Sequence, residues 1–201
     1  MEPLERRAQI LEHAARLFGD KGYHDTSISD IINSAGIARG TFYLYFENKR
    51  GIFEELVDGL LERLMEAIRV VDTSPGAPSA RQQLIDNFTR VLELFSEQRA
   101  LLSILLKGAV GLDRDIDFKL SDFYEKVTDA IESSLRLGQQ MRLVRPCDTR
   151  IAALIGLGAF KEVLHEVLRR DDPGSADLTA LATDVLDVLS RGVLVEGVSI
   201  P

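Results

Sequence analysis

The residues best suited to chemistry gather in one short stretch of the chain. Residues 39–50 contain Arg39, Lys49 and Arg50 against a single acid, Glu47, which gives a local charge of +2. The chain has nine phenylalanines and four tyrosines, and four of these thirteen aromatic residues also lie there, at Phe42, Tyr43, Tyr45 and Phe46. A tyrosine beside basic residues can donate a hydrogen bond to phosphate while its ring packs on the sugar. The stretch therefore indicates contact with a nucleic-acid backbone.

A metal site is the main competing chemistry. Glu162 and His165 have the Glu-x-x-His spacing of di-iron helical bundles, but such a site needs two copies and further inward glutamates, and only one copy exists. Cys147 is the only cysteine, so it forms neither an internal disulfide nor a thiolate metal cluster. No glycine-rich phosphate loop or nucleophile elbow is present. We expect no cofactor, no metal and no enzymatic activity. A metal-binding bundle enzyme and a helical interaction module without DNA binding remain the alternatives.

Composition sets the broad class of protein. The 201 residues fit one ordinary domain or a small module fused to a larger one, and 45% apolar with 28% charged residues is a globular balance. The longest near-continuous apolar run, residues 151–160, is about half the length that a bilayer requires. The first residues are charged and lack the apolar segment of a signal peptide. We expect a cytoplasmic protein without a membrane partner.

The net charge of −8 argues at first against nucleic acid, because a protein that binds phosphates should show a basic footprint. Its distribution changes this conclusion. Residues 1–50 hold seven basic and seven acidic residues, whereas residues 51–201 hold seventeen and twenty-five. The excess acid thus lies outside the segment that contains the basic and aromatic stretch.

Helical periodicity predicts the elements that position this stretch. Leu4, Ala8, Leu11, Ala15 and Phe18 predict a first amphipathic helix. Ser27 and Asp30 form a capping box that starts a second short helix, which Gly36 ends. A third helix follows over residues 38–46, and Asn48 caps a fourth that reaches about Val71.

The remainder is also helical. Residues 73–79 contain two prolines and a glycine and break the pattern. Three further stripes predict helices up to about residue 135, and two more follow at about 149–170 and 176–194. No segment alternates with a period of two for long enough to be a strand. We predict an all-α protein of about nine helices. Its parts are a helix-turn-helix domain (1–50), a connecting helix and linker (51–78), and an effector-binding and dimerisation domain (79–201).

Two short helices joined at residues 35–37 have the layout of a helix-turn-helix unit, whose second helix enters the major groove. This part of the chain resembles the DNA-binding domain of TetR-type regulators. The resemblance is carried by Gly22, residues 26–31 and residues 35–49. The match covers about forty-five residues, including both helices, the turn and the lysine that opens the next helix. Beyond it, only helix number and length agree with the family.

The resemblance implies a role for each matching residue. Ser27 would cap the second helix and Ser29 would stand at a phosphate-contact position. The front of the recognition helix, Arg39, Gly40 and Thr41, would face bases or backbone, while Tyr43, Tyr45 and Lys49 would contact phosphates. Ala38 departs from the family because a serine or threonine usually caps the recognition helix there. Leu44 could touch a thymine methyl or pack on a neighbouring turn, and Phe42 and Phe46 share one face as core residues.

The resemblance also implies a ligand-responsive regulator, usually a repressor, that binds a near-palindromic operator as a homodimer. Residues 151–160 are apolar all round and, with the final helix, could pack against a second copy, where Gly156 and Gly158 permit close approach. An unidentified small-molecule effector, whether a drug-like cation, an acyl chain or an aromatic metabolite, would bind among five aromatic residues and tilt the fourth helix. These are Phe88, Phe95, Phe123, Tyr124 and Phe160.

Overall fold

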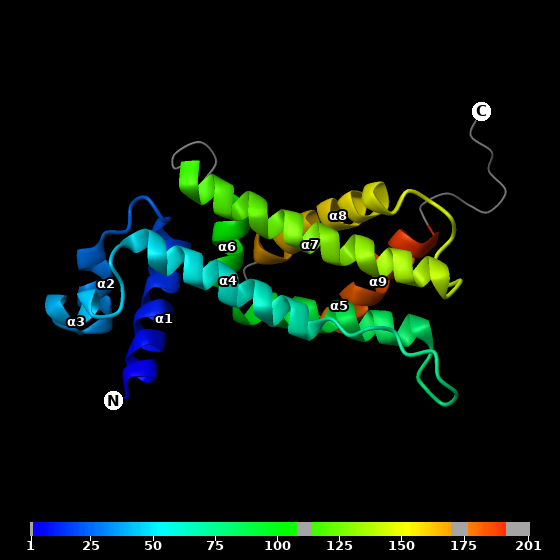
Figure 1. Ribbon diagram of the computed structural model, residues 1–201, viewed down its shortest axis with the longest axis horizontal. Helices are drawn as coiled ribbons and strands as arrows, with labels where there is room; N and C mark the ends of the chain where they lie inside the picture. The colour runs from blue at the N-terminus through cyan, green and yellow to red at the C-terminus, as the bar shows by residue number, and fades with distance from the viewer. Residues whose placement is uncertain (1, 108–113, 170–176, 192–201) are drawn as a thin grey trace. The chain divides into compact units, whose positions relative to one another are not determined.

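The computed structural model describes residues 2–107, 114–169 and 177–191, and within these ranges the chain is helical with no strand (Figure 1). The elements are α1 (Pro3–Lys21), α2 (Ile28–Ala35), α3 (Arg39–Tyr43), α4 (Lys49–Ala67), α5 (Ala80–Glu97), α6 (Arg99–Lys107), α7 (Arg114–Gln140), α8 (Thr149–Arg169) and α9 (Leu178–Arg191). The all-α prediction with about nine helices is confirmed for the described residues. The predicted helix ends at Arg170, Ala176 and Leu194 lie outside them.

The predicted start and end of the second helix are confirmed. Ser27 Oγ accepts from the backbone N–H of Asp30 at 3.1 Å, and the Asp30 carboxylate accepts from the backbone N–H of Ser27 at 2.9 Å. The backbone N–H of Ser27 and its hydroxyl, which donates to the same carboxylate at 2.8 Å, lower the pKa of Asp30. Gly36 ends α2 with φ of 63°, a left-handed conformation that glycine adopts without steric cost. Its N–H satisfies carbonyls of the last turn of α2.

The register predicted for α1 is wrong except at Phe18. Leu4 is 81% exposed, whereas Ile10, Ala14 and Phe18 form the buried stripe. Alanines and leucines occur on two overlapping faces of this helix, and the sequence alone does not show which face meets α2 and α6, the helices against which α1 packs. Arg7, three residues before Ile10, lies on the same face as the buried stripe.

The recognition helix is shorter than the predicted range 38–46. After Tyr43 the backbone tightens, because the N–H groups of Leu44 and Tyr45 bond to the carbonyls three residues earlier, on Thr41 and Phe42. As expected, no side chain caps the helix at Ala38. The fourth helix likewise ends at Ala67, four residues before the predicted end at Val71.

The chain divides into two compact units. Unit 1 comprises residues of Met1–Met65 and Glu97–Val127, and unit 2 comprises residues of Glu66–Ser96 and of the range from Thr128 onward. In unit 1, Tyr23 lies edge-on to Phe18 and Phe53, with ring centroids 5.1 and 5.2 Å away. Gly19 meets Ala100 of α6 so closely that a Cβ on it would lie 2.7 Å from the Ala100 Cα. Unit 1 thus has an aromatic core and a close contact between α1 and α6.

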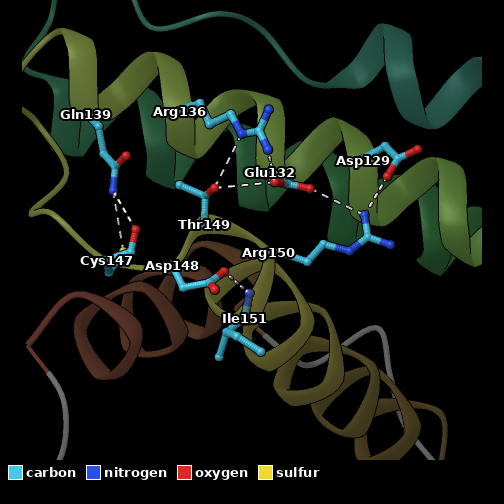
Figure 2. A network of polar contacts seen from close by, with 9 residues as sticks. All are labelled: Asp129, Glu132, Arg136, Gln139, Cys147, Asp148, Thr149, Arg150 and Ile151. Carbon is cyan, nitrogen blue, oxygen red and sulfur yellow. Dashed lines mark hydrogen bonds and ion pairs between the residues drawn. The ribbon is translucent and has the colours of Figure 1, made fainter.

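Polar side chains fix the backbone inside unit 2. Figure 2 shows Arg150 at the start of α8 reaching Asp129 and Glu132 of α7, at 2.5 and 3.4 Å. At the exit of α4, the buried amide of Asn87 both accepts from the N–H of Arg69 and donates to its carbonyl, at 2.9 and 2.8 Å. The amide therefore holds the backbone that follows α4 in a fixed place.

Candidate nucleic-acid interface

Two phenylalanines anchor the recognition helix in the core of unit 1. Phe42 is fully buried and Phe46 is 4% exposed, which confirms the prediction that both belong to the core. Their neighbours face the other way: Tyr43 is 44% exposed and Leu44 is 82% exposed. The short helix is thus fixed by one face and free to meet a ligand with the other. The exposure of Leu44 excludes the alternative in which it packs on a neighbouring turn.

The front of α3 presents a cation and an unobstructed backbone. Arg39 is exposed, and its guanidinium carbon lies 5.8 Å from the centroid of the Tyr43 ring. Gly40 is exposed, and a Cβ added to it would meet no heavy atom within 4 Å. No atom of the described residues restricts this helical position to glycine, although glycine weakens a helix. A surface that approaches the helix backbone from outside would require it.

The two serines predicted to lie at the interface have different roles in the structure. The hydroxyl of Ser27 is engaged in the capping box with Asp30 and so stabilises the start of α2. Ser29 is exposed on the first turn of α2. Ser27 is exposed as well, and the phosphate contact assigned to Ser29 by resemblance stays a prediction.

Arg7 connects three elements of unit 1, and the sequence analysis did not identify it. Its guanidinium donates to both oxygens of Glu55 on α4, at 2.8 and 2.5 Å, and to the carbonyl of Tyr45 at 2.9 Å. It also lies 4.4 Å from the centroid of the Phe46 ring. The hydrogen bond with Glu55 raises the pKa of Arg7 above its ordinary value. Its position three residues before Ile10 is the sequence signal that could have revealed it.

Lys49 does not simply project toward solvent. Its Nζ donates to the carbonyls of Tyr23, His24 and Thr26 at 2.6, 3.2 and 2.7 Å. The same atom lies 4.3 Å from the centroid of the Tyr23 ring. The first residue of α4 is therefore bound to the loop between α1 and α2.

The five aromatic residues predicted to bind an effector fall into both units. In unit 2, Phe88 and Phe160 meet edge to face with centroids 5.6 Å apart, and Phe95 is buried. In unit 1, Phe123 and Tyr124 have centroids 5.5 Å apart. The Tyr124 hydroxyl donates to the Leu105 carbonyl at 2.9 Å, and burial raises its pKa to about 12. The effector role of all five stays a prediction.

The Glu162 and His165 pair does not resemble a metal centre. The two side chains are 85% and 47% exposed, and the closest oxygen and nitrogen are 3.9 Å apart. Across the part of the chain that the structure describes, no group of three potential metal ligands comes together. Within those residues, no helix is both long and apolar enough to cross a membrane.

An apolar face remains uncovered on α8 and α9 of unit 2. Large aliphatic side chains there are between 38% and 63% exposed: Ile151, Leu154, Ile155, Val188 and Leu189. Gly156 and Gly158 lie on the same helix as the first three, and a Cβ on either would meet nothing within 4 Å. This is the face on which the sequence predicts a second copy of the chain.

Known proteins resemble both the helix-turn-helix region and the chain as a whole. Residues 10–56 match the model of "Bacterial regulatory proteins, tetR family". The fatty acid metabolism regulator protein of Bacillus subtilis is 26% identical over 92% of this chain and 94% of its own length. The transcriptional repressor KstR2 of Mycolicibacterium smegmatis is 31% identical over 62% of this chain and 58% of its own length.

Solved structures share the whole fold. The fatty acid degradation regulator FadR from Bacillus halodurans has a TM-score of 0.77 at 22% identity, covering 96% of this chain and 97% of that one. FadR from Bacillus subtilis, solved in complex with stearoyl-CoA, has a TM-score of 0.74 at 24% identity and covers 93% of this chain and 99% of that one. These relatives are transcriptional regulators and not enzymes. The helix-turn-helix geometry, the family match at residues 10–56 and the regulators that share the fold together show that this chain carries a TetR-type helix-turn-helix domain and is similar along its length to transcriptional regulators.

Proposed function

We propose that this regulator is a repressor that binds a near-palindromic operator as a homodimer and leaves it when a long-chain fatty acyl-CoA binds. The observation that carries the DNA-binding part is the division of residues 39–46, which comprise α3 and the turn after it, into two sides. Phe42 and Phe46 are buried, whereas Arg39, Tyr43 and Leu44 are exposed. Such a helix can enter the major groove without rearrangement of its core.

The homodimer is supported by the apolar face of α8 and α9. Exposed aliphatic side chains that share one face of a helix, as Ile151, Leu154 and Ile155 do on α8, mark an interaction surface rather than a solvated one. A two-fold copy would cover them, with Ile155 near Gly156 and Gly158, where backbones can approach closely. Two recognition helices would then reach successive major grooves roughly 34 Å apart.

The effector class is supported by the relatives. A protein named as a fatty acid metabolism regulator aligns along nearly the whole chain, and a FadR of the same fold was solved with stearoyl-CoA. An acyl chain needs apolar contacts, and the half-buried pair Phe88 and Phe160 in unit 2 can provide them. The effector would shift the protein toward a state with a different tilt of α4 through its higher affinity for that state.

The test is fluorescence anisotropy with a labelled duplex from the region upstream of the protein's own gene. At low salt the protein should bind, and the affinity should fall steeply with added KCl as counterions are released. Stearoyl-CoA should weaken binding at least tenfold, while coenzyme A alone should not. F160A should keep wild-type DNA affinity but lose sensitivity to stearoyl-CoA. Binding that stearoyl-CoA leaves unchanged would eliminate the proposed effector, and no binding at low salt would eliminate this operator.

A further inference from the structure

We infer that Lys49 is a positioning residue, which orders the loop between α1 and α2 for DNA binding, rather than a phosphate contact. The inference deepens the proposed function because it assigns a different role to one residue of the same interface. An ammonium group has three N–H donors. Three backbone carbonyls, those of Tyr23, His24 and Thr26, accept from it at 2.6–3.2 Å.

Two features of this cation make it a poor phosphate ligand. A phosphate would have to replace hydrogen bonds that already match the number of its donors, and lost hydrogen bonds to a charged group are costly. The face of the Tyr23 ring also stabilises it, with Nζ 4.3 Å from the centroid. Tyr23 itself is fixed in the aromatic core by Phe18 and Phe53.

The loop that Lys49 holds leads directly into α2. Thr26, 1% exposed, donates its hydroxyl hydrogen toward the carbonyls of Leu17 and Gly22, which are 3.1 and 2.8 Å away. Thr26 thus fixes the loop to the end of α1, while Lys49 fixes the same loop to the start of α4. The next residue, Ser27, caps α2, so loosening the loop would displace the first helix of the helix-turn-helix unit.

The two roles predict different salt dependences. A lost phosphate contact reduces the slope of log affinity against log salt by about 0.9 per subunit. A positioning role lowers affinity but leaves the slope unchanged, because no counterion is released at Lys49. We therefore expect K49M to bind the upstream duplex at least tenfold more weakly with the wild-type slope. R39M, which removes an exposed cation from α3, gives the slope change that a true DNA contact produces.

Two further variants separate charge from loop order. K49R keeps the charge, but its planar guanidinium cannot aim three donors at carbonyls that converge on one nitrogen, so it should bind nearly as weakly as K49M. T26V leaves Lys49 intact and removes the hydroxyl that holds the loop from the other side. It should weaken DNA binding with an unchanged slope. K49R with wild-type affinity, or T26V that loosens the loop without weakening DNA binding, would overturn the inference.

Hydrogen exchange tests the loop without DNA. In K49M and T26V, amides of residues 24–31 should exchange at least tenfold faster, while those of the α4 core around Leu60 keep their protection. Unchanged exchange at residues 24–31 in K49M would overturn the inference even if the upstream duplex proved not to be the operator. A K49M slope reduced by about 0.9 per subunit would overturn it as well. If wild-type protein ignores the duplex, the proposed operator fails, and the exchange result alone decides the role of Lys49.

Discussion

Replacing Gly40 by alanine should stabilise the protein and at the same time lower its affinity for DNA. The new methyl group would meet no heavy atom within 4 Å, and Gly40 is helical rather than left-handed. At such a position alanine stabilises by about 0.4–1 kcal/mol, chiefly by restricting the unfolded chain. For a protein of this size, each kcal/mol corresponds to a melting-temperature rise of about 2–4 °C.

The effect on DNA has the opposite sign. Gly40 lies on the exposed front of α3, where the backbone would approach the duplex, and a methyl group there would hold the helix away. Loss of one charge-assisted hydrogen bond to phosphate costs about 1.5–3 kcal/mol, and about 1.4 kcal/mol corresponds to a tenfold change in affinity. We therefore expect G40A to bind the upstream duplex at least tenfold more weakly in anisotropy titrations, while its melting temperature rises in calorimetry.

Gly59 in the middle of α4 is the matched control. A Cβ on Gly59 also meets nothing within 4 Å, and the residue lies well inside a regular helix. G59A should stabilise the protein by a similar amount and leave DNA affinity unchanged. If G40A is stabilised yet binds as tightly as wild type, the front of α3 does not approach DNA closely. If G40A is destabilised, the added methyl group must clash with neighbouring atoms.

Three other predictions follow from burial and charge. F42A, which removes a fully buried ring, should lose about 3–5 kcal/mol of stability in urea unfolding; by contrast, L44A at an 82% exposed site should change stability by less than about 0.5 kcal/mol while weakening DNA binding. I155R should yield a folded monomer in sedimentation velocity, and a persistent dimer would show that another face joins the copies. Because hydrogen bonds from Ser27 lower the pKa of Asp30, the stability it gives is present above its ordinary value of 3.8 and lost as pH falls through the folded-state value. The stability difference between wild type and D30N should thus vanish in strong acid, and a constant difference would contradict this.

The sequence was sufficient where local rules decide the structure. The Ser27 and Asp30 capping box, the left-handed Gly36 and the core positions of Phe42 and Phe46 depend on residues at most four apart, and all are as predicted. The helical class follows from periodicity for the same reason. Resemblance to a family then placed the exposed residues of α3 at an interface.

Contacts between distant residues escaped prediction. Arg7 meets Glu55 and the Tyr45 carbonyl across 48 and 38 positions of sequence, and Lys49 reaches carbonyls 23–26 residues earlier. Every residue has a backbone carbonyl, so the sequence does not show which carbonyl a charged side chain will bind. Sequence reasoning therefore expects such a side chain to face solvent or a ligand. The stripe on α1 was misplaced for a related reason, since only the tertiary contact with α6 selects Ile10 and Ala14 over Leu4 and Ala8.

The amide of Asn87 has a consequence for how this chain can vary. Because it fixes both backbone polar groups of Arg69, the direction in which the chain leaves α4 is set before residues 73–79 begin. Those residues form no helix, and closing a longer loop costs little extra entropy. Insertions or deletions at the Pro75-Gly76 turn can therefore accumulate without altering where α4 ends or how α5 begins.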